Sequence, residues 1–404
     1  MGRCIRFRRC RRARVHSSIL DDRSRCVQSC RPTLFMTLHS YRFIAACEER
    51  FDFRSAEYRA LFEASGANAF QHPIWLAQLH ERLVGDGACE AVTITVRHRR
   101  DGTLALVLPM VRRRAGGMKL VEFADMRVTD YAAAVCDRET LKSIADDEEI
   151  HRAIRAELKP FDVLRIAKLH ECTADDLCRI LDAGSLRRMK TSAYACELPG
   201  NFDAWRDAKM RRSFRRDLDK KTRQLHRRGA TTFETVRDGE EIARTLEAMR
   251  AFRASRFRSE EQAAGDLLRS RDHREFYLAV AREGAAQYAR MYRICVDGRI
   301  VACAMGLSHA GALLVVLIGF DQAEFGRQSV GSLLFQHIGR DCIERGDRLL
   351  DFTIGDEAYK SYFGAEQRPL FTLSKVRTPT GLIADVATER LPFVKEWARS
   401  VLDH

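Results

Sequence analysis

The sequence predicts an α/β fold, in which sheets with flanking helices form two successive halves. Three observations support this class. At 404 residues the chain is long enough to build more than one hydrophobic core. From residue 41 onward, short apolar or alternating segments recur between segments with helical periodicity. The turn Pro199-Gly200-Asn201 separates two such series, so we place the domain boundary there, with an N-terminal unit at 37–200 and a C-terminal unit at 201–404.

The N-terminal segment, residues 1–36, differs in composition from the rest. Its first 35 residues contain ten arginines and two acids, a charge of +8 out of the total of +13. It shows no hydrophobic periodicity and no apolar central region of a secretory signal. We expect a disordered extension without a catalytic role. Three interpretations of this extension stay open. It is an organelle-targeting peptide or a nucleic-acid-binding arm, or else Met36 is the real start and the segment is no part of the native protein.

The overall composition predicts a cytoplasmic protein without a metal. The longest apolar run, residues 312–320, is too short to span a bilayer. The thirteen cysteines are irregularly spaced, and neither a Cys-x-x-Cys motif nor a zinc-like Cys/His cluster occurs. Free thiols in a reducing compartment are therefore expected.

The first half alternates helices with short strands. Residues 91–97 and 103–111 predict a hairpin, because Asp101-Gly102 lies between them and is a strong turn signal. The other expected elements are helices at 55–65, 73–83, 146–157 and 174–183, and strands at 121–128, 132–136 and 163–166.

The second half opens with a basic segment that predicts one long helix over 202–228. Its apolar residues follow a helical stripe: Met210, Phe214, Leu218 and Leu225. Ten basic residues surround them: Lys209, Arg211, Arg212, Arg215, Arg216, Lys220, Lys221, Arg223, Arg227 and Arg228. This face either meets phosphates or is a surface on which arginine stems cover apolar area. Beyond it we expect strands at 231–236, 288–296, 300–308, 312–320, 349–353 and 370–376, and helices at 240–257, 272–283, 329–344 and 385–402.

The segment from Asp351 to Lys360 combines a strand end with reactive side chains. The strand breaks at Gly355, and two acids, a phenol and an amine follow the break. Titratable groups just past a strand end are typical of an α/β active site, because the strand positions the loop that presents them. The alternative is an ordinary turn with a solvated charged face.

Three groups of residues resemble the GNAT (N-acetyltransferase) enzymes of cellulose and exopolysaccharide biosynthesis, which are related to Fem-type aminoacyltransferases. The first is the basic helix leading to Phe252-Arg253-Ala254-Ser255-Arg256-Phe257. The second combines Asp297-Gly298-Arg299, Gly319-Phe320-Asp321 and Ser329-Val330-Gly331-Ser332, and the third is Asp351-Phe352-x-x-Gly355-x-Glu357-x-Tyr359-Lys360. The resemblance implies two tandem GNAT-like units, of which the first is degenerate, and acetyl-CoA or another acyl-CoA as co-substrate.

A thioester donor requires a binding site for its pyrophosphate. Backbone N–H groups at a helix N-terminus suit an anion, and the segment before the helix at 329–344 occupies that position. It departs from the usual GNAT signature, because Ser332 stands one position early for the final small residue. The expected cofactor-binding residues are Arg327, Gln328, Ser329, Val330, Gly331 and Ser332.

The same resemblance assigns roles around the reactive segment. Lys360 is expected to stabilise the transition state and Tyr359 to protonate the departing thiolate. Glu357 or Asp351 would accept the amine proton, although Asp351 is equally well explained as a structural residue. Further expected roles are binding of an anionic acceptor by Arg253 and Arg256, lining of the cleft between the units by Asp130 and Tyr131, and a structural role for His72.

The predicted function is acyl-CoA-dependent transfer to the nitrogen of an amino sugar or other small amine, such as a nucleotide-sugar acceptor, in exopolysaccharide, cellulose or envelope biosynthesis. Two alternatives stay open. One is Fem-like transfer from charged tRNA, which the basic helix favours. The other is a non-catalytic partner in polysaccharide synthesis. The acceptor, the acyl chain length and the oligomeric state do not follow from the sequence.

Overall fold

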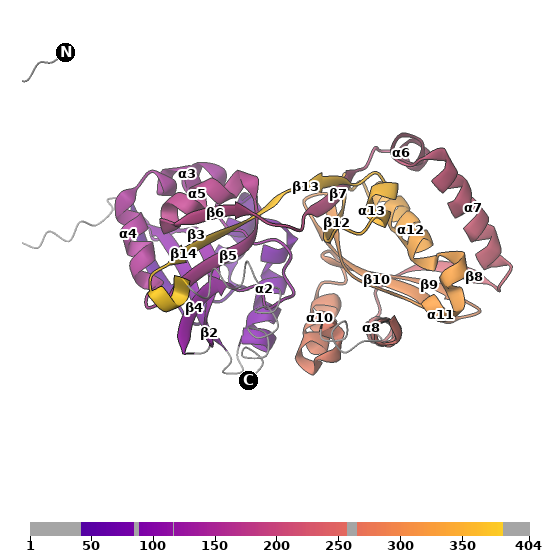
Figure 1. Cartoon of the computed structure of the whole chain (residues 1–404), viewed down its shortest axis with the longest axis horizontal. Helices are drawn as coiled ribbons and strands as arrows, with labels where there is room; N and C mark the ends of the chain where they lie inside the picture. Colours follow the sequence, from indigo (N-terminus) through magenta and orange to yellow (C-terminus); the bar gives the residue numbers. More distant parts are fainter. Residues whose placement is uncertain (1–41, 85–88, 116, 257–264, 383–404) are drawn as a thin grey trace, which may run out of the picture. The chain divides into compact units, whose positions relative to one another are not determined.

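The computed structural model describes residues 42–84, 89–115, 117–256 and 265–382 (Figure 1). The predicted Arg-rich extension and the predicted helix at 385–402 lie outside the described residues. The described elements form two seven-stranded mixed sheets with flanking helices.

The first sheet has the strand order β1-β2-β3-β4-β5-β14-β6. The hairpin expected around Asp101-Gly102 is present, with Gly102 at a φ of 73°. Pairing is antiparallel except between β4 and β5, which run parallel. The strands are β1 (Phe43–Glu48), β2 (Cys89–His98), β3 (Leu104–Ala115), β4 (Met118–Phe123), β5 (Val163–His170), β6 (Ser185–Arg188) and β14 (Leu370–Val376).

Helices cover both faces of this sheet because side chains alternate along each strand. On β3, Leu106 and Leu108 pack in one core with α3 (Arg138–Ala145), α4 (Glu148–Glu157) and α5 (Glu171–Leu181). Val107 and Val111, on the other face, pack with α1 (Ala56–Ala64) and α2 (Pro73–Leu79), which a short π-helix at His80–Val84 follows. The expected strand at 132–136 is wrong, since only isolated bridges at Ala132 and Val135 link it to β5 and β3.

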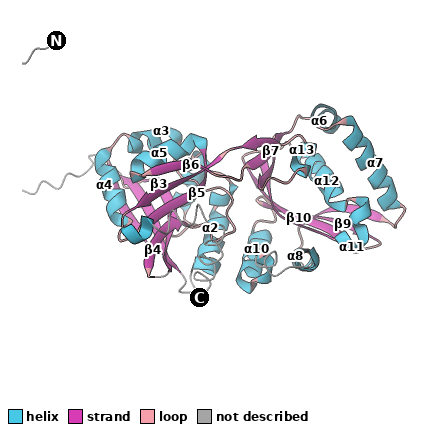
Figure 2. Cartoon of the chain, in the orientation of Figure 1, coloured by secondary structure: helices cyan, strands magenta, loops and turns pink. Residues whose placement is uncertain are grey.

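The second sheet has the order β13-β7-β12-β11-β10-β9-β8. Figure 2 shows α7 and α12 beside one face and α10 beside the other. Its strands are β7 (Ala193–Glu197), β8 (Thr231–Val236), β9 (Ala289–Val296), β10 (Arg299–His309), β11 (Ala312–Phe320), β12 (Leu349–Ile354) and β13 (Glu366–Arg368). Its main helices are α6 (Phe202–Lys209), α7 (Arg212–His226), α8 (Gly239–Arg256), α10 (Arg271–Glu283) and α12 (Val330–Glu344).

The helix expected over 202–228 is wrong in one respect: it is two helices. Met210 and Arg211 have ψ angles of 135° and 142°, so the backbone is extended between α6 and α7. Trp205 on α6 and Leu218 on α7 are both buried in the same core. At 3.6 residues per turn, an unbroken helix would place these two side chains roughly 140° apart, so it could not bury both.

Two strands pair with the sheet on the other side of the expected domain boundary, which lies between residues 200 and 201. β7 precedes the boundary but pairs with β12 and β13 of the second sheet. β14 comes late in the chain but lies between β5 and β6 of the first sheet. Each sheet thus contains one strand from the other side of the expected boundary. The division of the chain into two domains at this boundary stays a prediction.

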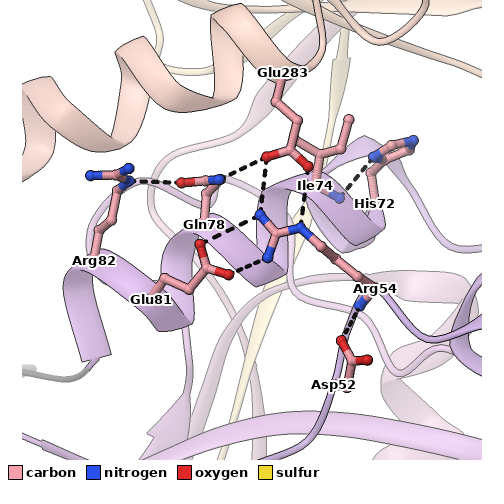
Figure 3. A network of polar contacts seen from close by, with 8 residues as sticks. All are labelled: Asp52, Arg54, His72, Ile74, Gln78, Glu81, Arg82 and Glu283. Carbon is pink, nitrogen blue, oxygen red and sulfur yellow. Dashed lines mark hydrogen bonds and ion pairs between the residues drawn. The ribbon is translucent and has the colours of Figure 1, made fainter.

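A polar network also links the first half to α10 of the second half (Figure 3). Glu283 accepts hydrogen bonds from Arg54 Nη2 at 3.0 Å and from Gln78 Nε2 at 2.7 Å, and Arg54 also forms an ion pair with Glu81. The buried rings of Trp75 on α2 and Phe276 on α10 also meet edge to face at 4.8 Å. Because the ion pairs are partly exposed, the shared apolar core contributes more to holding the halves together.

Replacement of a buried side chain on β14 tests its structural role. Leu373→Ala is expected to lower the free energy of unfolding by about 2–5 kcal/mol, because it leaves a cavity in the core of the first sheet. Leu382→Ala is the matched control, since Leu382 is 56% exposed and its loss should change little. Chemical denaturation measures both, and equal stabilities would contradict an anchoring role for β14.

Candidate active site

The second sheet opens between β11 and β12. The two strands pair in parallel over three residues each, Ala312 to Leu314 with Leu349 to Asp351. Further along β11, the register against β10 shifts at Met305 and leaves Val316 between two paired residues, a bulge. In the described part of the chain, no strand pairs with residues 315–320 on the β12 side. Their peptide groups are thus available to a ligand or to side chains.

The turn after β12 contains an unusual backbone conformation. Thr353 has a φ of 56°, which is a true outlier for a β-branched residue and costs about 1–3 kcal/mol. Phe352 and Thr353 together lie opposite Tyr194 of β7, so β12 bulges here as well. The Thr353 N–H donates to Asp351 Oδ1 at 2.7 Å, and its hydroxyl donates to the Val315 carbonyl at 3.3 Å. The turn is thereby connected to the open edge of β11.

Lys360 holds this turn in place. Its side chain is only 2% exposed, and its ammonium donates to the carbonyl oxygens of Thr353 at 3.2 Å and Gly355 at 2.9 Å. It also forms an ion pair with Glu357 Oε2 at 3.0 Å. An ammonium has three protons, so these three partners can use all of them. The arrangement makes Lys360 a positioning residue, and its predicted role in the transition state remains a prediction.

Asp351 and Tyr131 meet across the two halves of the chain. The Tyr131 hydroxyl donates to Asp351 Oδ1 at 2.7 Å, and both side chains are buried. Burial raises the pKa of Asp351 to about 6, although the hydrogen bonds from Tyr131 and the Thr353 N–H act in the opposite direction. A carboxyl group with a pKa near neutrality can accept a proton at physiological pH.

Asp130 lies in the same polar region. Burial raises the pKa of its carboxyl, and the charge of the Lys168 ammonium, the nearby Thr353 side chain and the charge of Lys360 oppose the rise. Lys168 itself forms an ion pair with Asp125 at 3.0 Å and donates to the Thr129 carbonyl at 2.7 Å. The structure therefore brings together four predicted site residues from both halves: Asp130, Tyr131, Asp351 and Lys360.

The other two predicted catalytic residues differ in their surroundings. Glu357 has a side chain that is 55% exposed and bound to Lys360. The Tyr359 ring stacks on Phe335 with centroids 5.2 Å apart and contacts Phe352 edge to face. The catalytic roles expected for Glu357 and Tyr359 stay predictions.

The predicted cofactor-binding residues form one continuous turn into α12. Residues Gly326–Gln328 form a 3-10 turn, and Ser329 follows in a left-handed conformation with a φ of 51°. Its hydroxyl makes no capping bond to the described helix start. Val330 is buried, and a Cβ on Gly331 would lie 3.1 Å from the Phe320 ring. Lys221 of α7 donates to the Arg327 carbonyl and joins the basic helix to this turn.

The two predicted acceptor-binding arginines have different outcomes. Arg253 Nε donates to Asp266 Oδ1 at 2.7 Å, and its Nη1 donates to the Ile318 carbonyl at 3.2 Å. It therefore lies at the open edge of β11 but is engaged by protein groups. Arg256 is the last residue of α8, and its side chain is outside the described part of the structure.

Sequence reasoning missed Thr353 and Asp266. Neither belongs to a motif, and a positive φ at a threonine has no sequence signal. A weak signal existed for Asp266, because Asp precedes short helices as a cap, and it does cap the 3-10 helix Leu267–Arg269. Its burial beside Arg253 could not be predicted.

Comparison with known proteins agrees with this geometry. Residues 212–361 match the family model of the acetyltransferase (GNAT) domain, a range that includes α7, the open strand pair and the reactive turn. This part of the chain thus has a GNAT-like fold, and the predicted α/β fold class is confirmed.

Among solved structures, FemX is similar, with a TM-score of 0.56 and 13% identity over 81% of this chain and 97% of FemX. A conserved protein of unknown function from Bacteroides thetaiotaomicron gives 0.52 and 10%, over 82% of this chain and 99% of that one. The C-terminal domain of a protein assigned as a lysylphosphatidylglycerol synthetase, from Agrobacterium fabrum, gives 0.51 and 15%, over 82% and 94%. At such identities the likeness concerns the fold alone. A search of curated proteins gives no significant match.

The described residues contain no helix long and apolar enough to cross a membrane. The same residues contain no group of three or more His, Cys, Asp or Glu side chains placed to hold a metal ion.

Removal of the Tyr131 hydroxyl tests its contact with Asp351. Tyr131→Phe is expected to raise the pKa of Asp351 above about 6, because the hydrogen bond that stabilises the carboxylate is lost. Carboxyl NMR titration measures this pKa. Tyr288→Phe is the matched control, since the buried Tyr288 hydroxyl donates to the Ala69 carbonyl at 2.7 Å. Both variants lose a buried hydrogen bond, but only Tyr131→Phe should shift the pKa of Asp351. An unchanged pKa in Tyr131→Phe would contradict the hydrogen bond between Tyr131 and Asp351.

Proposed function

We propose that the protein is an acyl-CoA-dependent N-acyltransferase, in the simplest case an acetyltransferase, that acts on an amino sugar or other small amine. One observation carries the proposal: β11 and β12 part immediately beyond Asp351, within the segment that matches the GNAT domain. An open parallel strand pair offers peptide groups to a ligand that carries amides of its own, and a carboxyl group of raised pKa lies at the point of divergence.

The donor, acyl-CoA, fits the residues around this opening. Its amide-bearing arm would pair with the peptide groups of this edge of β11 that Thr353 and Arg253 do not engage, in the manner of an added strand. Its pyrophosphate would meet the backbone N–H groups at the start of α12, with Arg327 adding positive charge. Close packing of Gly331 on Phe320 keeps this backbone free of side-chain bulk.

The chemistry follows from the groups near the opening. Asp351 would accept the proton that the attacking amine must lose, since its pKa of about 6 leaves it ionised at neutral pH. Peptide N–H groups of the β11 bulge at Val316 would stabilise the oxyanion that forms on the acyl carbon. Tyr359 would protonate the departing thiolate. Lys360 would fix the turn and, as the resemblance implies, add positive charge near the transition state.

The acceptor and the pathway belong to the same proposal. We place the acceptor among amino sugars, nucleotide-linked or free, and the reaction in exopolysaccharide, cellulose or envelope synthesis, on the strength of the sequence resemblance alone. A protein that keeps the fold without turnover would be a structural partner in the same process.

Transfer from charged tRNA is a second candidate, which one surface feature favours. Along α7 and its C-terminal capping residue, five exposed basic residues fall on a single face, because their spacing repeats every three to four residues. They are Arg212, Arg216, Lys220, Arg223 and Arg227. A row of arginines and lysines of this kind suits a phosphate backbone, and FemX shares the fold.

Ligand binding separates the two candidates. Acetyl-CoA at a hundred times its Kd is expected to stabilise the fold by about 2.7 kcal/mol, visible as a higher Tm, whereas charged tRNA alone should not. Arg327→Glu should weaken acetyl-CoA binding by about tenfold or more, because it places a negative charge beside the pyrophosphate. Arg100→Glu, an exposed residue of the first sheet's hairpin turn, is the matched control. Stabilisation by charged tRNA without any by acyl-CoA would refute the leading proposal.

The pH dependence of turnover tests the role of Asp351. Its carboxylate accepts a proton only when ionised, so turnover should fall as the pH drops through about 6. In Asp351→Asn this acidic limb should disappear, together with most of the activity. Glu357→Gln, which changes an exposed carboxylate on the same turn, should retain the limb. Persistence of the limb in Asp351→Asn would show that another group accepts the proton.

A further inference from the structure

Asp266 has a buried carboxylate oxygen that the fold does not use. Its side chain is 1% exposed. Oδ1 accepts hydrogen bonds from Arg253 Nε at 2.7 Å and from the Leu268 N–H at 3.3 Å. Oδ2 is also buried, and among the described residues no donor reaches it. The capping of the short 3-10 helix and the ion pair with Arg253 therefore explain one oxygen only.

An unsatisfied carboxylate oxygen in a protein interior is unfavourable and rare. A purely structural cap would be served equally well by Ser or Asn, which carry less charge into the interior. Such a group is retained at a cost in stability when a ligand supplies the missing donor. Oδ2 accepts only, so the missing partner must be a hydroxyl, an amine or another N–H.

The position of Asp266 relates it to the proposed active site. Its partner Arg253 also donates to the Ile318 carbonyl, and Thr353 donates to the Val315 carbonyl, on the same open edge of β11. These two attachment points are three residues apart, roughly 10 Å along a strand. Asp266 and Asp351 thus bound the two ends of one stretch of open strand.

We infer that Asp266 binds the acceptor: its Oδ2 accepts a hydrogen bond from a hydroxyl or second amine of a substrate whose reacting amine lies beside Asp351. The inference rests on the proposed function and narrows it to amines that carry a further hydrogen-bond donor some distance from the reacting nitrogen. Arg253 is then a positioning residue for Asp266. The sequence led us to expect that Arg253 binds an anionic acceptor. The present inference replaces this expectation with an acceptor that donates a hydrogen bond to Asp266.

Direct binding of two amines tests the inference. The probes are the β-1,4-linked disaccharide of glucosamine, rich in hydroxyl donors, and octylamine, which has none beyond its amine. Calorimetry without acyl-CoA should show tighter binding of the disaccharide to the wild type. In Asp266→Asn the amide oxygen keeps the hydrogen bonds from Arg253 and Leu268, so the amide NH₂ takes the place of Oδ2. This NH₂ group is a donor and cannot accept the hydrogen bond that the substrate donates. Disaccharide affinity should fall at least about tenfold, with octylamine unaffected.

Two further variants keep the experiment decisive. Asp137→Asn makes the same chemical change at the cap of α3, remote from β11, and should leave both affinities unchanged. Asp266→Ser retains a capping oxygen while removing Oδ2, so it replaces Asp266→Asn if that variant fails to fold. Equal disaccharide affinity in wild type and variant overturns the inference, as does a wild type that does not prefer the disaccharide. Failure of acyl-CoA to stabilise the wild type overturns the proposed function separately.

Discussion

The buried ammonium of Lys360 is the interaction on which the candidate site depends. It binds the carbonyls of Thr353 and Gly355, and so holds a threonine in a left-handed conformation that it would not otherwise adopt. In that conformation the Thr353 N–H reaches Asp351 and the hydroxyl reaches the edge of β11. Without the lysine the turn would lose its internal partner, and the surrounding carbonyls would be buried without donors.

The two halves of the chain form one structural unit around this turn. Tyr131 from the first half donates to Asp351 from the second, and the core that contains Trp75 also contains Phe276. β7 and β14 are exchanged between the sheets, and β13 and β14 follow the reactive turn directly. A first half without the reactive motif thus still contributes groups to the site.

Local patterns in the sequence were sufficient for most elements of the second half. The strands at 231–236 and 312–320 were predicted with the bounds that the structure has, since each is a short β-branched or apolar run between turn signals. The helix over 202–228 was predicted as one piece because its stripe from Met210 to Leu225 is helical, yet burial of Trp205 on the same core requires a break. The segment 132–136 is apolar, but it forms only two isolated β-bridges and no strand.

The sequence by itself determined the class of the fold, the basic helix, the turn into α12 and the cluster from Asp351 to Lys360, because these are runs of neighbouring residues whose spacing carries the information. The tertiary structure alone decided that Lys360 is buried, which strands pair, that β11 and β12 part, and that Asp266 lies near that opening. Apart from the bonds of Lys360 within its own turn, these are contacts between residues tens to hundreds of positions apart. They depend on how the sheets pack, and local periodicity contains no record of that packing.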